Sequence, residues 1–206
     1  MVPIEEGNFY HLYNRGANRS KIFWSDSDFR KFIELYRFYL YPAVETYSWC
    51  LLRNHFHFLV RVRTKEDQTE LFKRDRELFK AGFFHGKLNP ATSPYNVSRQ
   101  LSHLMNRYTR FINKKRQRSG TLIQGPIKRK HIANEAYFLN LICYIHKNPI
   151  HHGIVDNYSS YLHSSYKDII GTHPTFMERD KIHDLFGGIH GFLSAHQEYK
   201  LDMDID

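Results

Sequence analysis

The stretch VETYSWCLLRNHFHFLVRV, residues 44–62, is typical of two β-strands joined by a tight connection at Arg53-Asn54. Side chains of a strand alternate between its two faces, so His55 and His57 share one face, while the intervening phenylalanines point to the other. The pattern therefore predicts an antiparallel hairpin that carries two histidines side by side on a rigid element.

Two imidazoles on one strand face can chelate a divalent cation. Arg61 and Arg63 continue the same face, and guanidinium groups beside a metal would suit an enzyme that handles phosphates. The alternative is that the two histidines are only solvated polar positions on a half-exposed strand. The hairpin alone leaves both interpretations open.

The composition indicates a globular protein with a basic surface. Of the 206 residues, 41% are hydrophobic and 16% aromatic, which is enough for one substantial core. We predict a main domain over residues 1–155 and a C-terminal helical extension over residues 156–206. The formal net charge of +9 favours a polyanionic partner, either nucleic acid or an anionic membrane surface.

Several features argue against the membrane. No apolar run approaches the roughly 20 residues that a spanning helix needs, and the start MVPIEE lacks a basic segment followed by an apolar one. Cys50 and Cys143 both lie in apolar-patterned elements, where reduced, buried thiols are expected. We therefore expect a cytoplasmic protein without a disulfide framework.

The remaining periodicities give the order strand, helix, strand, strand, helix, strand, which matches a split βαβ, ferredoxin-like plan of the α+β class. Its antiparallel sheet would carry helices on one face and leave the other free, with the two histidines looking outward. Residues 64–94 predict a short helix and a mobile basic loop. Strands are expected over residues 9–13, 44–53, 54–63 and 120–125, and helices from a cap at Asp26 or Ser27 to about Leu40 and from Pro94, capped by Ser93, to about Lys114.

A further helix, from Glu135 to Asn148 after an Asn134 cap, is expected against the sheet and is stopped by Pro149. Tyr144 and Asn148 lie one helical turn apart and so share a face. A phenol can be the nucleophile of a phosphoryl transfer, and an amide oxygen can complete a set of three metal ligands with the two histidines. This ligand set suits Mn²⁺ better than Mg²⁺.

Each of these residues also has an ordinary structural explanation. The chain has 14 tyrosines, and a tyrosine on an amphipathic helix usually packs its ring with the hydroxyl at the rim. Tyr108, the rival nucleophile, lies on an apolar helical stripe, and we assign it to the core. His146, His151 and His152 near the helix end more often contact carbonyl dipoles, so no role is assigned to them.

Basic segments around residues 114–118 and 128–131 could be solvated faces or a surface for nucleic acid. Tyr47, Trp49, Phe83 and Phe84 are aromatic residues that could stack on unpaired bases, which favours a single-stranded partner. The DNA-contact candidates are Arg15, Arg61, Arg107, Arg110, Lys114, Lys115, Arg116, Lys128, Arg129 and Lys130.

Several separate segments, in order along residues 8–166, resemble the single-tyrosine transposases with a His-hydrophobic-His (HUH) motif. The likeness is to the IS-two-hundred-like superfamily, especially its REP-associated tyrosine transposase branch. It is far more specific than the histidine pair alone. The segments are YHLYNRG (10–16), CLLRNHFHFLV (50–60), RYTRFIN (107–113), GTLIQG (120–125), YIHKNPIHHGIV (144–155) and SSY (164–166).

The resemblance implies that His55 and His57 bind Mg²⁺ or Mn²⁺ and that Asn148 stands where the family places its third ligand, often a glutamine. It further implies that Tyr144 attacks single-stranded DNA near a hairpin, leaving a 5′-phosphotyrosine and a free 3′-hydroxyl. Such strand transfer needs no nucleotide triphosphate, and the chain has no Walker-type glycine loop. The chain departs from the family at Pro126-Ile127, where a basic and then an aromatic residue are usual.

We therefore expect a metal-dependent single-stranded DNA endonuclease and strand transferase, a transposase whose partner is hairpin DNA. One alternative is a ferredoxin-like module that binds single-stranded nucleic acid on its open sheet without catalysis. Another is a metal-dependent phosphodiesterase that uses water and forms no covalent intermediate. The sequence is compatible with both a monomer and a homodimer that shares its sites.

Overall fold

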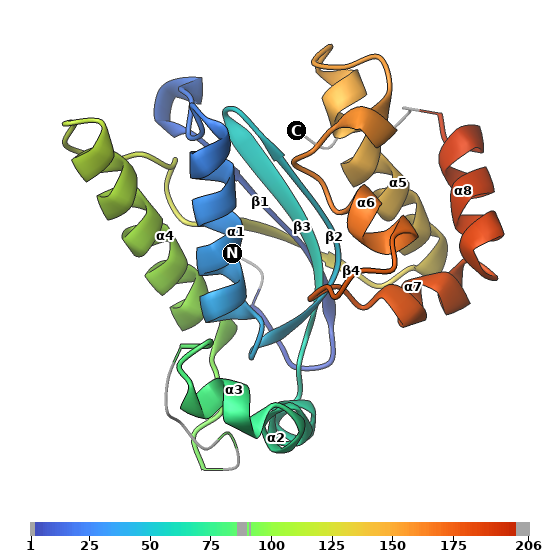
Figure 1. Ribbon diagram of the computed structural model, residues 1–206, viewed down its shortest axis with the longest axis horizontal. Coiled ribbons are helices and arrows are strands. Elements are labelled where there is room, and N and C mark those ends of the chain that lie inside the picture. The colour runs from blue at the N-terminus through green and yellow to red at the C-terminus, as the bar shows by residue number, and fades with distance from the viewer. Residues whose placement is uncertain (1–2, 86–89, 91, 201–206) are drawn as a thin grey trace.

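The computed structural model describes residues 3–85, 90 and 92–200. Four antiparallel strands form one sheet in the order β2-β3-β1-β4. This order and the helices between the strands confirm the predicted ferredoxin-like, α+β fold (Figure 1). The strands are β1 (Phe9–Arg15), β2 (Val44–Leu52), β3 (His55–Val62) and β4 (Lys128–Ile132).

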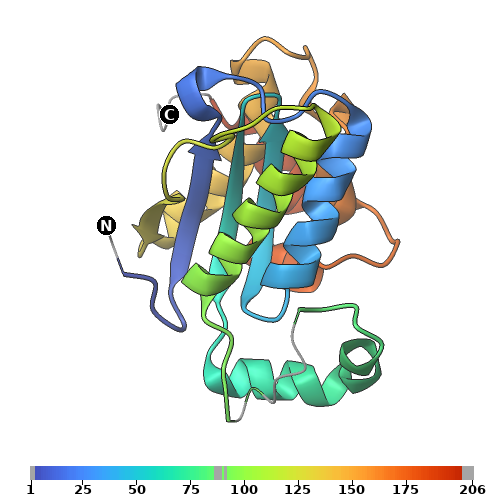
Figure 2. The same cartoon turned by 90° about the vertical axis from the view of Figure 1, so that its left-hand side faces the viewer.

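Helices α1 (Asp26–Leu40) and α4 (Val97–Lys115) lie side by side on one face of the sheet (Figure 2). The phenylalanines of the histidine strand point to this face, as the alternation predicts. The ring of Phe32 on α1 packs 5.2 Å from that of Phe56 and 4.9 Å from that of Tyr108. Tyr108 is fully buried and its hydroxyl donates to the carbonyl oxygen of Ile22 at 2.8 Å, so its assignment to the core is confirmed.

The expectation of a free sheet face is wrong. Helix α5 (Glu135–His151) crosses the face opposite to α1 and α4 and packs on β2 and β3. Its Phe138 contacts Phe9 and Tyr47, with ring centroids 4.9 and 5.2 Å apart. Because both faces of the sheet carry apolar side chains, covering the second face removes additional apolar surface from water. His57 is fully buried as a result.

The fourth strand lies later in the chain than predicted. Residues 120–125 form no strand, and only Ile123 makes an isolated bridge, to Gly16. Gly120 and Gly125 have φ angles of 83° and 56°, which an extended strand cannot accommodate. The basic segment 128–132 pairs with β1 instead.

Pro149 lies inside α5 and does not end it, contrary to the prediction. A proline in the last turn removes only its own N–H donor. The helix end is closed by hydrogen bonds from the amides of His152, Gly153 and Ile154 to the carbonyl oxygens of Asn148, Ile150 and Pro149, at 3.1, 2.8 and 2.9 Å.

The helix starts show which polar side chains serve as caps. Asn134 caps α5 as predicted, since its side chain accepts from the amide of Tyr137 at 2.9 Å. Helix α4 begins at Val97 with Asn96 as its cap, three residues later than predicted. Ser25, rather than Asp26 or Ser27, caps α1. The first residue of a helix depends on which of several neighbouring polar side chains hydrogen-bonds to the unpaired amides of its first turn.

Between β3 and α4 the chain forms two helices, α2 (Lys65–Arg74) and α3 (Arg76–Lys80), where one was predicted. The basic loop expected next lies partly outside the described residues, because residues 86–89 and 91 are not among them. A short turn of 3₁₀-helix, η1 (Ala17–Arg19), follows β1.

The C-terminal extension covers the edge of the sheet. The amides of Leu51, Ser165 and Glu178 donate to the carbonyl oxygens of His163, Trp49 and Thr46, at 2.9, 3.0 and 3.0 Å, so two extension segments pair with β2. Pairing of this kind protects an edge strand from other chains. The division at residue 155 stays a prediction. The elements of the extension are η2 (Tyr158–Ser160), α6 (Tyr166–Ile170), α7 (Arg179–Leu185) and α8 (Ile189–Glu198).

No helix in the described part of the chain is long and apolar enough to span a membrane. Cys50 and Cys143 are both buried free cysteines, as predicted. Burial raises the pKa of the Cys50 thiol far above its ordinary value and that of Cys143 to about 12. Both thiols are therefore protonated and unreactive at neutral pH.

A buried ion pair joins the two helices of the first layer. Asp28 of α1 is fully buried and contacts the ammonium group of Lys115 and the guanidinium group of Arg116 from the end of α4. It also accepts from the amides of Trp24 and Ser25 at 2.9 and 3.0 Å. Burial by itself raises the pKa of this carboxyl, but the hydrogen bonds outweigh it and the pKa lies below its ordinary value.

We predict that Asp28→Ala lowers the free energy of unfolding by about 3 kcal/mol at neutral pH, because it leaves buried donors and cations without their partner. A lowered carboxyl pKa stabilises the folded state above the unfolded-state value of 3.8, and this contribution is lost as the pH falls through the folded-state pKa. Urea unfolding at pH 7 and at pH 3 measures the effect. A difference from wild type that is equal at both pH values would contradict it.

Candidate active site

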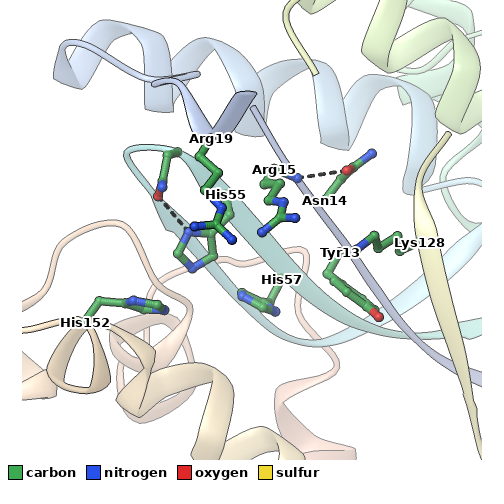
Figure 3. A pocket seen from close by; sticks show the side chains of 9 residues that line it. Tyr13, Asn14, Arg15, Arg19, His55, His57, Lys128 and His152 are labelled. Atoms are coloured by element: carbon green, nitrogen blue, oxygen red, sulfur yellow. Dashed lines mark hydrogen bonds between the residues drawn. The ribbon is translucent and has the colours of Figure 1, made fainter. Parts of the chain in front are cut away.

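The candidate site lies where the end of β1 meets the start of β3, on the sheet face that α5 covers. Arg15 is paired with His55, and Tyr13 with His57, in the antiparallel register. The side chains surround a pocket that opens at this end of the sheet (Figure 3). It is lined by Tyr13, Asn14, Arg15, Arg19, Asn54, His55, His57, Lys128 and His152.

The structure brings His55 and Asn148 together, as the sequence predicts. The Nε2 atom of His55 lies 3.2 Å from the Oδ1 atom of Asn148, and its Nδ1 atom lies 2.8 Å from the Oδ1 atom of Asn54. Both partners are amide oxygens, which can only accept, so a neutral His55 with one N–H can donate to only one of them. With the proton on Nδ1, the Nε2 lone pair faces the carbonyl oxygen of Asn148, an arrangement of two acceptors that a cation would stabilise.

Asn148 has no exposed surface, and its Nδ2 atom has no hydrogen-bond partner among the described residues. Because the protein does not hold this end of the amide, the orientation of Oδ1 depends on what lies between it and His55. Outer-shell hydrogen bonds usually orient metal ligands, so Asn148 is the least firmly held of the three ligand candidates.

His57 is held by a residue to which the sequence assigned no role. Its Nδ1 atom lies 2.9 Å from the Nε2 atom of His11 on β1, and the two rings stack at 5.1 Å between centroids. The ring of Tyr13 lies 4.7 Å from that of His11 and 6.1 Å from that of His57, nearly parallel to both. The alternation of β1 places His11 and Tyr13 on one face, but only the pairing register with β3 puts that face beside His57.

Tyr144 lies beside the metal-ligand candidates on α5. Its ring is 6.1 Å from that of His57 and nearly perpendicular to it, at 88°. The side chain is fully buried, and Tyr144 does not line the pocket. The structure therefore assembles the four predicted residues, while the phenol is enclosed in this arrangement.

The three unassigned histidines have different surroundings. The ring of His152 lies 4.6 Å from that of His55 and lines the pocket, and His151 lies 6.5 Å from Tyr144. His146 points away from the site, and its Nδ1 atom lies 2.8 Å from the Nε2 atom of His196 on α8. Burial lowers the pKa of His146 well below its ordinary value and that of His196 to about 4, so both are neutral and serve to attach α8.

Cations surround the mouth of the pocket. Arg15 donates from Nε to the Oε1 atom of Gln124 at 2.8 Å, and the ammonium group of Lys128 lies 5.7 Å from the ring centroid of Tyr13. Arg19, which was not among the candidates, also lines the pocket from η1, where its φ angle is 58°. Sequence reasoning missed Arg19 because its position depends on this irregular turn. The three side chains could bind phosphate groups at the site.

Arg61 and Arg63 do not lie beside the histidines, so that expectation is wrong. Arg61 lies about 20 Å further along β3 than His55, at the strand rise of about 3.3 Å per residue. It pairs with Asp67 at 2.9 Å, and Arg63 pairs with Glu45 at 3.2 Å. A strand is longer than one binding site, so residues on the same face of a strand can belong to different sites.

Some of the other basic candidates bond to protein groups, and others do not. Lys115 and Arg116 pair with Asp28. On β4, Arg129 donates a hydrogen bond to the hydroxyl of Ser98 at 3.3 Å, and Lys130 donates one to the hydroxyl of Tyr137 at 2.9 Å. On α4, Arg107, Arg110 and Lys114 are exposed and have neither an ion pair nor a side-chain hydrogen bond in the described part of the chain.

Most of the aromatic residues considered for base stacking are in the core. Tyr47, Trp49 and Phe84 are buried, so the prediction that they stack on bases is wrong. Phe83 is 63% exposed and remains available. Sequence alone cannot distinguish adjacent phenylalanines in a loop, because no period indicates which one faces inward.

The separation of His55 and Asn148 fits two ligands of a divalent cation. Two ligands of an octahedral ion at about 2.1 Å lie about 3 Å apart, close to the separation of the His55 and Asn148 atoms. Within residues 3–85, 90 and 92–200, no three His, Cys, Asp or Glu side chains form a metal site by themselves. A metal here would therefore depend on the amide of Asn148 as well as on the two imidazoles.

Comparisons with known proteins support the fold. No protein-family model and no curated protein matches the chain. One solved structure, of a REP-associated tyrosine transposase bound to a REP hairpin, aligns with a TM-score of 0.58 over 84% of this chain and 87% of that chain, with 15% sequence identity. At this identity the likeness shows a shared fold.

Proposed function

We propose that this protein is a metal-dependent single-stranded DNA endonuclease and strand transferase that acts as a transposase near a DNA hairpin. The observation that carries the proposal is the 3.2 Å approach of His55 to Asn148, with Tyr144 one helical turn away beside His57. The hairpin-bound transposase with the same fold supports the choice of substrate.

In the proposed reaction, His55, His57 and Asn148 hold Mg²⁺ or Mn²⁺, which would supply charge stabilisation at the scissile phosphate. Cationic side chains at the pocket mouth bind the neighbouring phosphates. The phenol oxygen of Tyr144 attacks phosphorus, and the bond to the 3′ oxygen breaks. The phenolic proton ends on that oxygen, which gives a 5′-phosphotyrosine and a free 3′-hydroxyl. A 3′-hydroxyl of another strand reverses the attack.

Burial of Tyr144 adds a step to this scheme. The phenol must become accessible before the phosphate can reach it, so α5 or the segment over it has to move when DNA binds. Pro149, five residues after Tyr144 in α5, has no N–H to donate, so the last turn of the helix has one hydrogen bond fewer.

The same enclosed phenol favours a second candidate function. A ferredoxin-like protein could bind single-stranded nucleic acid through the basic pocket mouth and use Tyr144 only as a core residue. The two functions differ in covalent chemistry and in their dependence on metal.

We predict that Tyr144→Phe abolishes the covalent protein–DNA adduct and leaves hairpin binding within about two-fold of wild type, because only the attacking oxygen is lost. Labelled single-stranded hairpin DNA with Mn²⁺, followed by denaturing electrophoresis, measures the adduct. Tyr137→Phe on the same helix is the matched control and should retain it. An undiminished adduct in Tyr144→Phe would rule out this nucleophile.

We predict that His55→Ala lowers Mn²⁺ affinity at least ten-fold in titration calorimetry, because one of three protein ligands is removed. His131→Ala, an exposed histidine on β4, is the control and should bind Mn²⁺ like wild type. Equal Mn²⁺ binding by wild type and His55→Ala would place the metal elsewhere. No Mn²⁺ binding by either protein would favour the non-catalytic function.

His11 is proposed as a positioning residue for His57. We predict that His11→Phe, which keeps a ring but cannot hydrogen-bond, weakens Mn²⁺ binding about ten-fold or more, as loss of an outer-shell partner commonly does. His11→Gln, which can still bond to the Nδ1 atom of His57, should recover part of the affinity. Calorimetry on both variants separates the hydrogen bond from packing. Equal affinities for the two variants would show that His11 only fills space.

A further inference from the structure

A second hollow lies on the other side of the sheet, between the outer faces of α1 and α4. Tyr39 of α1, His103 of α4 and the segment 82–85 line it. It belongs to the helix layer that Figure 2 shows in front of the sheet, whereas the candidate active site lies on the face that α5 covers. Nothing in the proposed chemistry uses it.

The hollow presents a group of aromatic rings. The ring of His85 lies 4.8 Å from that of Tyr39 and 5.1 Å from that of His103, and Tyr39 and His103 are aligned within 26° of each other. Phe83 lies at its margin with 63% of its surface exposed. Several aromatic rings around one hollow, including a solvent-exposed phenylalanine, offer flat apolar surfaces to a ligand.

The hollow is also positively charged. Arg107 and Arg110 line it from α4, and neither has an ion pair in the described residues. Lys114 continues this helical stripe, which extends about 10 Å at the helical rise of 1.5 Å per residue. Among the residues that line the hollow, Glu34 carries the one carboxylate. The Nζ atom of Lys31 lies 2.6 Å from its Oε1 atom, so the two side chains form an ion pair.

The cationic stripe leads toward the candidate active site. At its end, the side-chain amide of Asn113 donates to the carbonyl oxygen of Gly120 at 3.0 Å. The segment from there reaches the pocket, where the amide of Gln124 donates to the carbonyl oxygen of Arg15 at 2.8 Å.

We propose that the hollow between α1 and α4 is a second binding surface for single-stranded nucleic acid. Its rings stack on unpaired bases, and Arg107 and Arg110 bind the backbone phosphates. The combination distinguishes a single strand from other polyanions, because a duplex keeps its bases stacked on each other and an acidic peptide offers no base. This inference rests on the proposed function only where the bound strand is the flank of the DNA substrate.

The test uses the full chain and a fluorescent oligothymidylate of about 20 nucleotides, which forms no hairpin, in anisotropy titrations over a range of salt. Phe83→Ala should weaken binding about five-fold or more through lost stacking. The double variant Arg107→Gln, Arg110→Gln should weaken it about ten-fold and reduce the salt slope by about 1.4, two phosphate contacts on a single strand. Arg30→Gln, an exposed arginine on another side of α1, is the control for the loss of a positive charge outside the hollow and should bind within about two-fold of wild type.

Three outcomes would overturn the inference. The first is that oligothymidylate binding is unchanged both in Phe83→Ala and in the double variant at Arg107 and Arg110. The second is equal loss in Arg30→Gln, which would show a general effect of charge. The third is a blunt duplex of the same length that binds wild type as tightly and loses as much in Phe83→Ala.

Failure of the proposed function would look different. On a short substrate limited to the hairpin and the cleavage site, Phe83→Ala should form the Tyr144-dependent adduct as well as wild type does. If wild type forms no adduct while oligothymidylate binding still depends on Phe83, the proposed chemistry fails and the second surface stands.

Discussion

The register between β1 and β3 is the constraint on which the site depends. It sets His57 opposite Tyr13 and places His11 within 2.9 Å of His57. A slip of one residue would turn both histidines toward α1 and α4, and the phenylalanines of β3 toward α5. The apolar packing of Phe56 under the first helix layer thus fixes the polar geometry on the opposite face. Core and site are two sides of one strand.

Helix α5 meets two demands that oppose each other. It covers the second sheet face with a largely buried surface, and it also carries Tyr144 and Asn148 to the histidines. Burial holds these side chains in place, which favours a defined ligand geometry. The same burial encloses the phenol, so a reaction at Tyr144 requires local opening at a free-energy cost. Local opening of this kind is common at functional segments, which are drawn from the less stable parts of a fold.

The sequence was sufficient for features that local periodicity determines. The β2–β3 hairpin, the shared face of His55 and His57 and the core position of Tyr108 all follow from patterns of two or 3.6 residues. Features that depend on distant pairing could not be obtained in this way. His11 meets His57 across 46 residues, and the covering of the second sheet face by α5 is likewise a tertiary choice. The position of β4 depended on two glycines with positive φ, whose conformation a single sequence does not reveal.

The distribution of cations refines what the net charge of +9 means. Arg61, Arg63, Lys115 and Arg116 are paired with carboxylates inside the fold, where they hold elements together and are not available to a ligand. Among the ten DNA-contact candidates, those without an ion pair lie at the mouth of the histidine pocket, on β4 and along the outer stripe of α4. A count of basic residues would have treated these classes alike. A cation without a carboxylate partner contributes more to the field that extends into solvent, so these unpaired candidates are the ones through which the net charge can attract a polyanion.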